Sequence, residues 1–163
     1  MSRPTDLEMT FAEWMVDHRG IIVKIVRSFT SNRSDEEDLT QDINLALWRS
    51  VASFEGRSKA ATWIWRIALN QAISWQRADR PHNSIDHVAE PSAADGAHDS
   101  VLVDRIYHAI RTLKPIDRSL IVLSLEGYRY AEIAEITGLT ETNTGARLSR
   151  ARARLNRELE EAI

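Results

Sequence analysis

The stretch YAEIAEITGLTETNTGARLSRA, residues 130–151, decides the fold of the C-terminal part of the chain. It holds a short helical pattern, a Gly-Leu-Thr turn and the start of a longer helical pattern. Gly138 can adopt the left-handed conformation that ends a helix, and Thr140 is a suitable N-cap for the next one. Ile133 and Ile136 supply apolar packing between the two helices. This arrangement predicts a helix-turn-helix motif, which places its second helix in the major groove of DNA.

The second helix of this motif has an apolar face and a basic face. The apolar positions recur at steps of three and four residues; they are Thr144, Leu148, Ala151, Leu155 and Leu159. The basic positions recur likewise and lie about 110° from the apolar ones on a helical wheel; they are Arg147, Arg150, Arg154 and Arg157. Guanidinium groups bind phosphates or guanine edges through paired hydrogen bonds. A merely solvated helix face is the alternative, and the helix-turn-helix context favours contact with DNA.

Gly145 is unexpected in this helix, because glycine costs about 1 kcal/mol relative to alanine in a helix interior. We therefore expect the helix backbone to approach DNA closely here, with Ala146 adding only a methyl group. The few side chains left to read bases are then Thr142, Asn143 and Arg147. Arg152 points elsewhere and is expected to be a surface or partner residue.

Composition excludes several classes of protein. The 163 residues give room for one ordinary domain or two small ones, and the absence of cysteine fits a cytoplasmic protein. The five histidines are scattered, so we predict no metal site and no cofactor. The N-terminus does not have the form of a signal peptide, and no apolar run approaches the roughly 20 residues that span a bilayer. No nucleophile–base pair or phosphate-binding loop is evident, so an enzyme is not expected.

Helical periodicity dominates the chain, and no run of strand alternation appears. Helices are predicted over about 10–30, 35–53, 60–79, 100–112 and 115–126, followed by the helix-turn-helix. Thr10 with Glu13, and Ser34 with Glu37, have the form of capping boxes that begin the first two helices. Segment 80–100 holds two prolines, a glycine and almost no large apolar residue, which predicts a flexible linker. The chain is therefore predicted to be all-α, with two helical domains.

The predicted helix 35–53 carries a second face beside its apolar stripe. This face consists of Asp38, Gln41, Asp42, Leu45 and Trp48. Acidic side chains beside an exposed Leu and Trp suit a protein partner, because tryptophan is enriched at the energetic centres of interfaces. Alternatively, Leu45 and Trp48 belong to the core and the acids complement the positive N-terminal end of the helix. The residues themselves leave both interpretations open.

Segment 49–77 combines positive charge with aromatic side chains. It has five basic residues against one acid, and its aromatics are Phe54, Trp63, Trp65 and Trp75. Cationic side chains follow the backbone of single-stranded nucleic acid, and exposed aromatic rings stack on unpaired bases. We expect Trp63 and Trp75 to belong to the core, and Phe54 and Trp65 to be more exposed.

Together, these patterns resemble the extracytoplasmic-function (ECF) sigma factors of bacteria. The run DEEDLTQDINLALWRSVASFEGRSKAATWIWRIALNQAI, residues 35–73, is similar to sigma region 2. The run LKPIDRSLIVLSLEGYRYAEIAEITGLTETNTGARLSRARARL, residues 113–155, is similar to region 4. The resemblance implies a region 2 three-helix-type bundle (1–79), a flexible linker (80–100) and a region 4 helix-turn-helix domain (101–163).

The resemblance implies that the protein binds core RNA polymerase and directs promoter recognition and melting. Region 2 would dock on a coiled coil of the β′ subunit through Asp38, Gln41, Asp42, Leu45 and Trp48. The loop and helix that follow would capture the single-stranded −10 element and take a flipped base. The matching and neighbouring residues are Ser50, Phe54, Arg57, Ser58, Lys59, Trp65, Arg66 and Asn70.

Region 4 would bind the −35 element as duplex and pack on the β-flap of the polymerase. The expected DNA-binding residues are Thr142, Asn143, Gly145, Ala146, Arg147, Arg150 and Arg154. Many members carry a basic residue and a serine where this chain has Gly145 and Ala146, so promoter discrimination is expected to fall more on the −10 loop. An anti-sigma factor is a further expected partner. The alternatives are a sigma-like regulator that sequesters an anti-sigma factor or polymerase without initiating, and a plain helix-turn-helix repressor.

Overall fold

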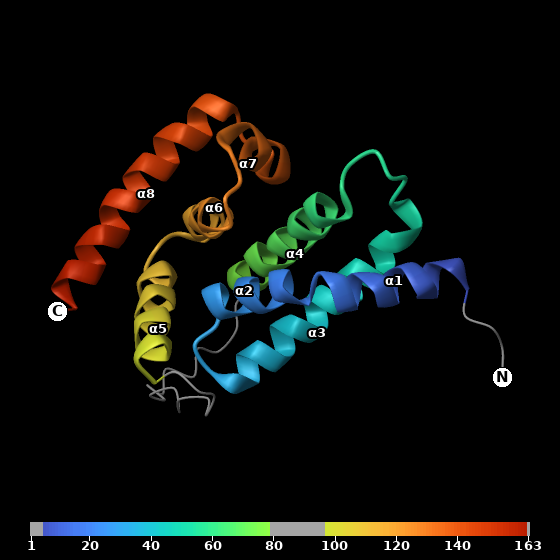
Figure 1. Cartoon of the computed structure of the whole chain (residues 1–163), viewed down its shortest axis with the longest axis horizontal. Coiled ribbons are helices and arrows are strands. Elements are labelled where there is room, and N and C mark those ends of the chain that lie inside the picture. Colours follow the sequence, from blue (N-terminus) through green and yellow to red (C-terminus); the bar gives the residue numbers. More distant parts are fainter. Residues whose placement is uncertain (1–4, 79–96, 163) are drawn as a thin grey trace.

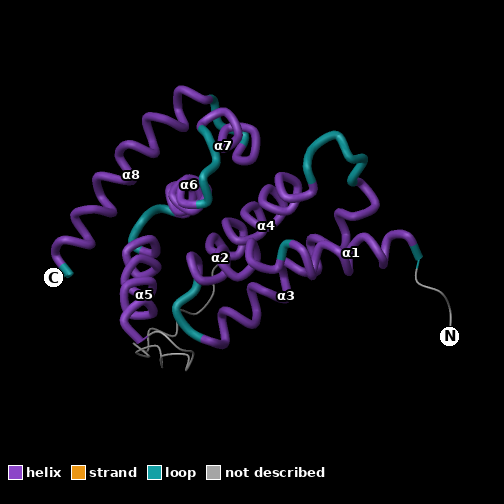
Figure 2. Tube along the Cα trace, viewed as in Figure 1, coloured by secondary structure: helices purple, strands orange, loops and turns teal. Residues whose placement is uncertain are grey.

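The computed structural model describes residues 5–78 and 97–162, and all regular structure in these ranges is helical (Figure 2). The helices are α1 (Asp6–Asp17), α2 (Arg19–Phe29), α3 (Arg33–Ser50), the 3-10 turn η1 (Val51–Ser53), α4 (Ala60–Arg77), α5 (Ala97–Arg111), α6 (Pro115–Leu125), α7 (Tyr130–Thr137) and α8 (Glu141–Glu161). The all-α prediction is thus confirmed. Most of the predicted linker lies outside the described residues, and α5 begins three residues earlier than predicted, inside the range given to that linker.

The predicted first helix over 10–30 is two helices that meet at His18, whose backbone (φ −121°, ψ 19°) is not helical. The chain also enters the helix earlier than predicted. Thr5 is the N-cap: the Glu8 amide donates to its hydroxyl at 3.3 Å, and the Thr5 amide donates to the Glu8 carboxylate at 2.6 Å. Thr10 lies inside α1 and donates its hydroxyl to the carbonyl four residues earlier. The predicted Thr10–Glu13 capping box is therefore wrong, and Thr5 with Glu8 forms the capping box of α1.

The start of α3 also differs from its prediction. Asn32 is the N-cap, and its Oδ1 accepts the Asp35 amide at 2.9 Å. Ser34 is already inside the helix, so the predicted Ser34–Glu37 capping box is wrong. Asparagine is as good a cap as serine, and the sequence alone offers both within three residues.

The N-terminal half packs α2, α3 and α4 against one another, with α1 resting on α2 and η1. Its largest fully buried side chains come from all three of the packed helices: Ile25, Leu39, Ile43, Leu47, Ile64 and Trp65. On α3 the buried residues are spaced by four, so the stripe leaves the opposite side of the helix facing outward.

The C-terminal half packs α6 and α7 against α8. Gly138 has φ +77° and ends α7, and the Thr140 hydroxyl accepts the Asn143 amide at 3.1 Å to begin α8. Ile133, Ile136 and Leu148 are buried between the helices (at most 3% exposed). The predicted helix-turn-helix is confirmed, including the residues that end one helix and begin the next.

The two halves pack directly on each other, with α2 and α4 facing α5, α6 and α7 (Figure 1). Lys24 Nζ lies 2.8 Å from the Glu126 carboxylate, and Arg27 lies 2.9 Å from Asp104. These exposed ion pairs flank a continuous set of buried apolar side chains that draws on both halves. Apolar burial, rather than the ion pairs, supplies most of the stabilisation at this contact.

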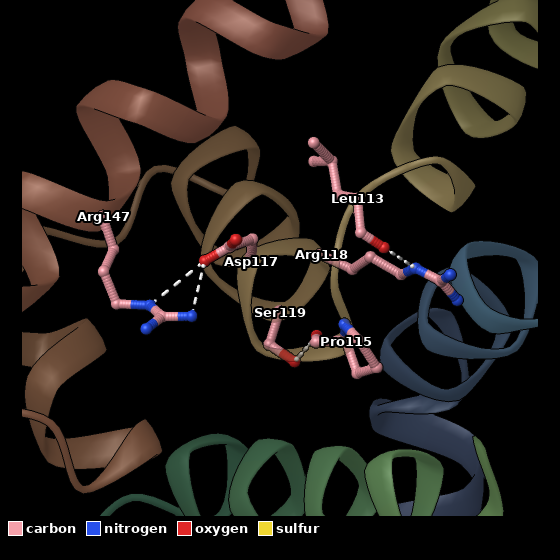
Figure 3. A network of polar contacts seen from close by, with 6 residues as sticks. All are labelled: Leu113, Pro115, Asp117, Arg118, Ser119 and Arg147. Carbon is pink, nitrogen blue, oxygen red and sulfur yellow. Dashed lines mark hydrogen bonds and ion pairs between the residues drawn. The ribbon is translucent and has the colours of Figure 1, made fainter. Parts of the chain in front are cut away.

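Two half-buried arginines complete the contact. The guanidinium of Arg118 donates to the Leu113 carbonyl at 2.8 Å (Figure 3). It also donates to the Arg111 carbonyl at 2.7 Å, and its carbon lies 5.4 Å from the centre of the Phe29 ring. Arg111 donates to the Arg27 carbonyl at 2.9 Å. Burial lowers the pKa of both guanidinium groups. The carbonyls at the negative C-terminal ends of α2 and α5 accept hydrogen bonds from these groups and so offset the free-energy cost of burying their charge.

Candidate polymerase and nucleic-acid interfaces

The outward side of α3 carries the predicted partner face. Leu45 and Trp48 are 45% and 41% exposed, and Asp38 and Gln41 are exposed beside them. Asp42 is half-buried. Leu45 and Trp48 therefore do not belong to the core, so that alternative is excluded, and the partner face stays a prediction. An exposed Leu and Trp beside acidic side chains form a surface suited to a basic and apolar protein partner.

Three aromatic rings from three segments surround the end of α3. Phe54, in the loop after η1, lies edge-on to Trp14 with ring centres 5.3 Å apart and tilted against Trp63 at 5.5 Å. Phe54 and Trp63 are half-buried, whereas Trp14 is buried. The cluster fixes the conformation of the loop that joins α3 to α4.

Ser50, the last residue of α3, is bound to this cluster. Its hydroxyl donates to the Leu47 carbonyl at 2.8 Å and accepts the Trp63 indole N–H at 3.0 Å. Sequence analysis assigned Trp63 to the core and missed this polar role. Trp63 lies 13 residues after Ser50, so no helical spacing joins the two.

The loop and the start of α4 carry exposed charge. Arg57 and Glu55 form an exposed ion pair at 2.9 Å, and Lys59 is exposed at the N-cap of α4. Ser58 is half-buried. Asn70 is exposed on α4, and because it follows Trp63 by seven residues it shares that side of the helix.

Trp65 and Arg66 do not lie open to solvent beside these residues. Trp65 is 1% exposed, with its ring perpendicular to that of Tyr128 at 6.1 Å. Arg66 is half-buried and donates to the Glu135 carbonyl at 3.1 Å. The expectation that Trp65 is exposed is therefore wrong in this arrangement, because the C-terminal half covers that side of α4. By contrast, Trp75 is buried as expected.

The outward side of α8 carries most of the predicted duplex-binding residues. Thr142, Asn143, Ala146, Arg150 and Arg154 are exposed. Arg147 is half-buried instead, because its Nε and one terminal nitrogen each lie 3.1 Å from Oδ1 of Asp117 on α6 (Figure 3). One predicted DNA-binding arginine is thus paired with a carboxylate of α6.

Gly145 faces α7. A Cβ atom at this position would lie 3.3 Å and 3.5 Å from two ring carbons of Tyr130, so glycine makes room for that ring. Arg152 donates to the Tyr130 hydroxyl at 3.3 Å and to Ser124 Oγ at 2.6 Å, which holds the ring in place. A contact within the chain thus accounts for the glycine, while the predicted close approach to DNA stays a prediction. Arg152 lies on the surface, as expected, and binds side chains of α6 and α7.

Within residues 5–78 and 97–162, no three His, Cys, Asp or Glu side chains are grouped so that they could hold a metal ion. No helix in these ranges is long and apolar enough to cross a membrane. What the described surfaces offer is an acidic and apolar helix face, an aromatic cluster beside a basic loop, and a helix-turn-helix with arginines on its outward side.

Known families and relatives match both halves. A family model described as Sigma-70 region 2 matches residues 15–81, and one described as Sigma-70, region 4 matches residues 104–155. The ECF RNA polymerase sigma factor SigM of Mycobacterium tuberculosis is 26% identical over 143 residues, which cover 87% of this chain and 73% of SigM. The chain belongs to the ECF sigma factors. The ECF sigma-E factor of Haemophilus influenzae is 28% identical over 148 residues, covering 79% of this chain and 77% of that protein.

Two solved sigma factor structures are similar to the chain. RpoE of Bartonella quintana, in complex with the anti-sigma factor NepR, has a TM-score of 0.73 and 27% identity, covering 93% of this chain and 97% of that one. CnrH, in complex with the cytosolic domain of CnrY, has a TM-score of 0.68 and 23% identity, covering 94% and 89%, and supports the fold alone. In this ECF sigma factor, the α3 face and the aromatic residues Phe54 and Trp63 therefore lie in region 2, and the helix-turn-helix lies in region 4.

Proposed function

We propose that this ECF sigma factor directs core RNA polymerase to promoters through separate polymerase-binding and DNA-binding surfaces. Region 2 would occupy residues 1–79, the linker residues 80–100 and region 4 residues 101–163. The observation that carries the proposal is the exposure of Leu45 and Trp48 on α3, immediately before the aromatic cluster. Together with Asp38, Gln41 and Asp42, they would bind the coiled coil of the β′ subunit, while the apolar side of region 4 packs on the β-flap.

The loop after α3 would capture the single-stranded −10 element. Ser50, Phe54 and Asn70 would line the pocket for a flipped base, and Arg57, Ser58 and Lys59 would hold the strand. Unstacking a base costs a few kcal/mol, and a fitted pocket offsets that cost only for the right base. Trp65 and Arg66 would reach DNA only after region 4 separates from α4, because Tyr128 and Glu135 contact them in this arrangement.

The outward side of α8 would bind the −35 element as duplex. Thr142 and Asn143 at its N-terminal end would meet base edges, and Arg150 and Arg154 would bind phosphates. Gly145 and Ala146 add almost no side chain, so this helix would hold the backbone firmly and read few bases. Arg147 would join the contact by exchanging Asp117 for a phosphate.

The proposed binding to core RNA polymerase implies where the protein acts and which other partners it has. We infer that the protein works in the cytoplasm as a subunit without catalysis of its own, with no cofactor. An anti-sigma factor is a further proposed partner, since both similar structures are complexes of a sigma factor with such a protein or with CnrY. Such a partner would act on a chain whose two regions already touch.

The test is transcription in vitro with core polymerase, the full chain and genomic DNA, followed by mapping of start sites. We expect specific transcripts that share a −10 and a −35 sequence and disappear when the chain is omitted. Binding of core without promoter melting, monitored by permanganate reactivity of unpaired thymines, would identify a sequestering regulator instead. Sequence-specific duplex binding that needs no polymerase would identify a repressor.

A further inference from the structure

The contacts of the Ser50 hydroxyl group fix which hydrogen bond it donates and which it accepts. An indole N–H can only donate a hydrogen bond, so the Ser50 oxygen must accept from Trp63 across their 3.0 Å contact. The hydroxyl hydrogen cannot point at Trp63, and the Leu47 carbonyl lies 2.8 Å away to receive it. A hydroxyl has one hydrogen and two lone pairs, so Ser50 retains a single lone pair and no donor.

We propose that Trp63 is a positioning residue that makes Ser50 an acceptor only, so that the −10 pocket selects a base with an exocyclic amino group. Adenine, cytosine and guanine each offer such a donor. Thymine offers a methyl group and carbonyl oxygens around its single ring N–H. This inference rests on the proposed function, in which Ser50 lines the pocket for the flipped base.

The rings around Trp63 hold the indole in this orientation. Phe54 is tilted by 57° against Trp63, and Trp14, which is buried, lies edge-on to Phe54 at 78°. Each ring is therefore held by the next, from α1 through the loop to α4. The indole N–H is aimed at Ser50 before any base arrives, so the pocket pays no reorganisation cost on capture.

The acceptor is also accessible. Ser50 is half-buried rather than enclosed, and it is the last residue of α3. The Leu47 carbonyl that takes its hydrogen is fixed in turn, because it also accepts the Val51 amide. One lone pair of the half-buried Ser50 hydroxyl therefore remains to accept a hydrogen bond at the end of α3.

The probe is a set of fluorescent non-template −10 oligonucleotides from a mapped promoter, bound to the complex of the full chain with core polymerase. The flipped position is the one at which 2-aminopurine gains fluorescence on binding. We expect adenine to bind there about tenfold more tightly than unsubstituted purine, which lacks the amino group, and more tightly than thymine. Trp63→Phe keeps the ring but deletes the N–H, and the ratio of adenine to purine affinity should fall towards one.

Ser50→Ala tests the acceptor without touching the ring. It should bring the ratio of adenine to purine affinity close to one. Adding Trp63→Phe should change this ratio no further, since the two residues act through one hydrogen bond. Trp75→Phe is the matched control, because it makes the same change on the same helix about 18 Å along its axis. It should leave the ratio as in the natural chain.

Two results would overturn the inference while the proposed function stands: an adenine-to-purine ratio near one in the natural chain, or a ratio that survives Trp63→Phe. In the second case Trp63 is only a structural support, and all four bases should lose affinity equally. Failure of the complex to bind any −10 oligonucleotide would instead overturn the assignment of region 2 itself.

Discussion

Arg147 on α8 and Asp117 on α6 form an ion pair in which two guanidinium nitrogens each lie 3.1 Å from one carboxylate oxygen. Their side chains are 28% and 22% exposed, so the pair is neither solvent-separated nor fully enclosed. It connects α8, the outward helix of the helix-turn-helix, to α6, the helix that precedes the motif. An arginine assigned to DNA on sequence grounds thus already has a carboxylate partner in the free chain.

Asp117→Asn should therefore strengthen binding to a duplex −35 element. The change removes a negative charge that competes with phosphate for Arg147, so one more counterion is released on binding. The slope of log affinity against log salt should become steeper by about 0.9. Fluorescence anisotropy at several salt concentrations between about 50 and 200 mM measures this slope. Over that range, a protein with several phosphate contacts loses about 10³-fold in affinity.

Arg150→Ala is the reference for that experiment, since Arg150 is exposed on the same helix. It should weaken binding and make the slope shallower by a similar amount. If Asp117→Asn lowers the melting temperature and leaves the salt slope unchanged, Arg147 serves the fold and does not reach DNA. The stability cost of losing this part-exposed pair should not exceed about 1 kcal/mol.

Gly145→Ala should stabilise the chain only when the Tyr130 ring is absent. Alanine gains about 1 kcal/mol over glycine in a helix interior. In the natural chain its methyl group would lie 3.3 Å from the ring, which Arg152 holds, so the gain is lost. In a Tyr130→Ala background the gain should appear in full. Urea denaturation of the four variants measures the difference.

The same four variants separate the two explanations for the glycine. Equal stability changes in both backgrounds would mean that Tyr130 is not the reason for it. A loss of duplex affinity on Gly145→Ala without a loss of stability would point to close approach of the helix backbone to DNA. A coupling free energy of about 0.5 kcal/mol or more would assign the glycine to the ring.

Features set by neighbours in the sequence were predictable. The turn of the helix-turn-helix needs only Gly138 to leave the helical region and Thr140 to cap the next helix, and both do so. The helix starts near Thr5 and Asn32 were missed because several good capping residues compete within a few positions. Local chemistry predicts that a helix begins, and the packing of its first turn decides where.

Features set by distant partners were not predictable. Trp65 is covered by Tyr128, Gly145 makes room for Tyr130, and Trp63 donates to Ser50. Hydrophobic periodicity indicates which side of one helix is apolar, but not which other helix will cover it. The exposure of Leu45 and Trp48 shows the converse, because no helix within residues 5–78 and 97–162 buries this face of α3, although Phe11 of α1 meets the Trp48 ring at its edge.

Tyr128→Ala should expose Trp65. The perpendicular ring of Tyr128 covers the indole, which is 1% exposed, so its removal lets water reach Trp65 and should shift its fluorescence to longer wavelengths. Stability should fall by about 2 kcal/mol, since Tyr128 is only half-buried and the loss is smaller than for a core aromatic residue. Emission spectra and urea denaturation measure the two effects.

The control for that spectrum is the same change in a Trp65→Phe background, where the other tryptophans remain. There Tyr128→Ala should leave the emission maximum in place. A shift of equal size in both backgrounds would show that the signal arises elsewhere and that Tyr128 does not shield Trp65 in solution.

Trp48→Ala should weaken binding to core polymerase by about 30-fold, the effect of losing a hot-spot side chain worth about 2 kcal/mol. The fold should survive, because Trp48 is 41% exposed and its packing inside the chain includes an edge contact with Phe11 at 5.4 Å. Val16→Ala is the matched control: Val16 is 79% exposed on α1, in the same half of the protein but off the α3 face. Biolayer interferometry with immobilised core, alongside thermal melts, measures both variants. Equal affinities of Trp48→Ala and Val16→Ala for core polymerase would place Trp48 outside the polymerase interface. A large fall in the melting temperature of Trp48→Ala would show instead that Trp48 is needed for the fold.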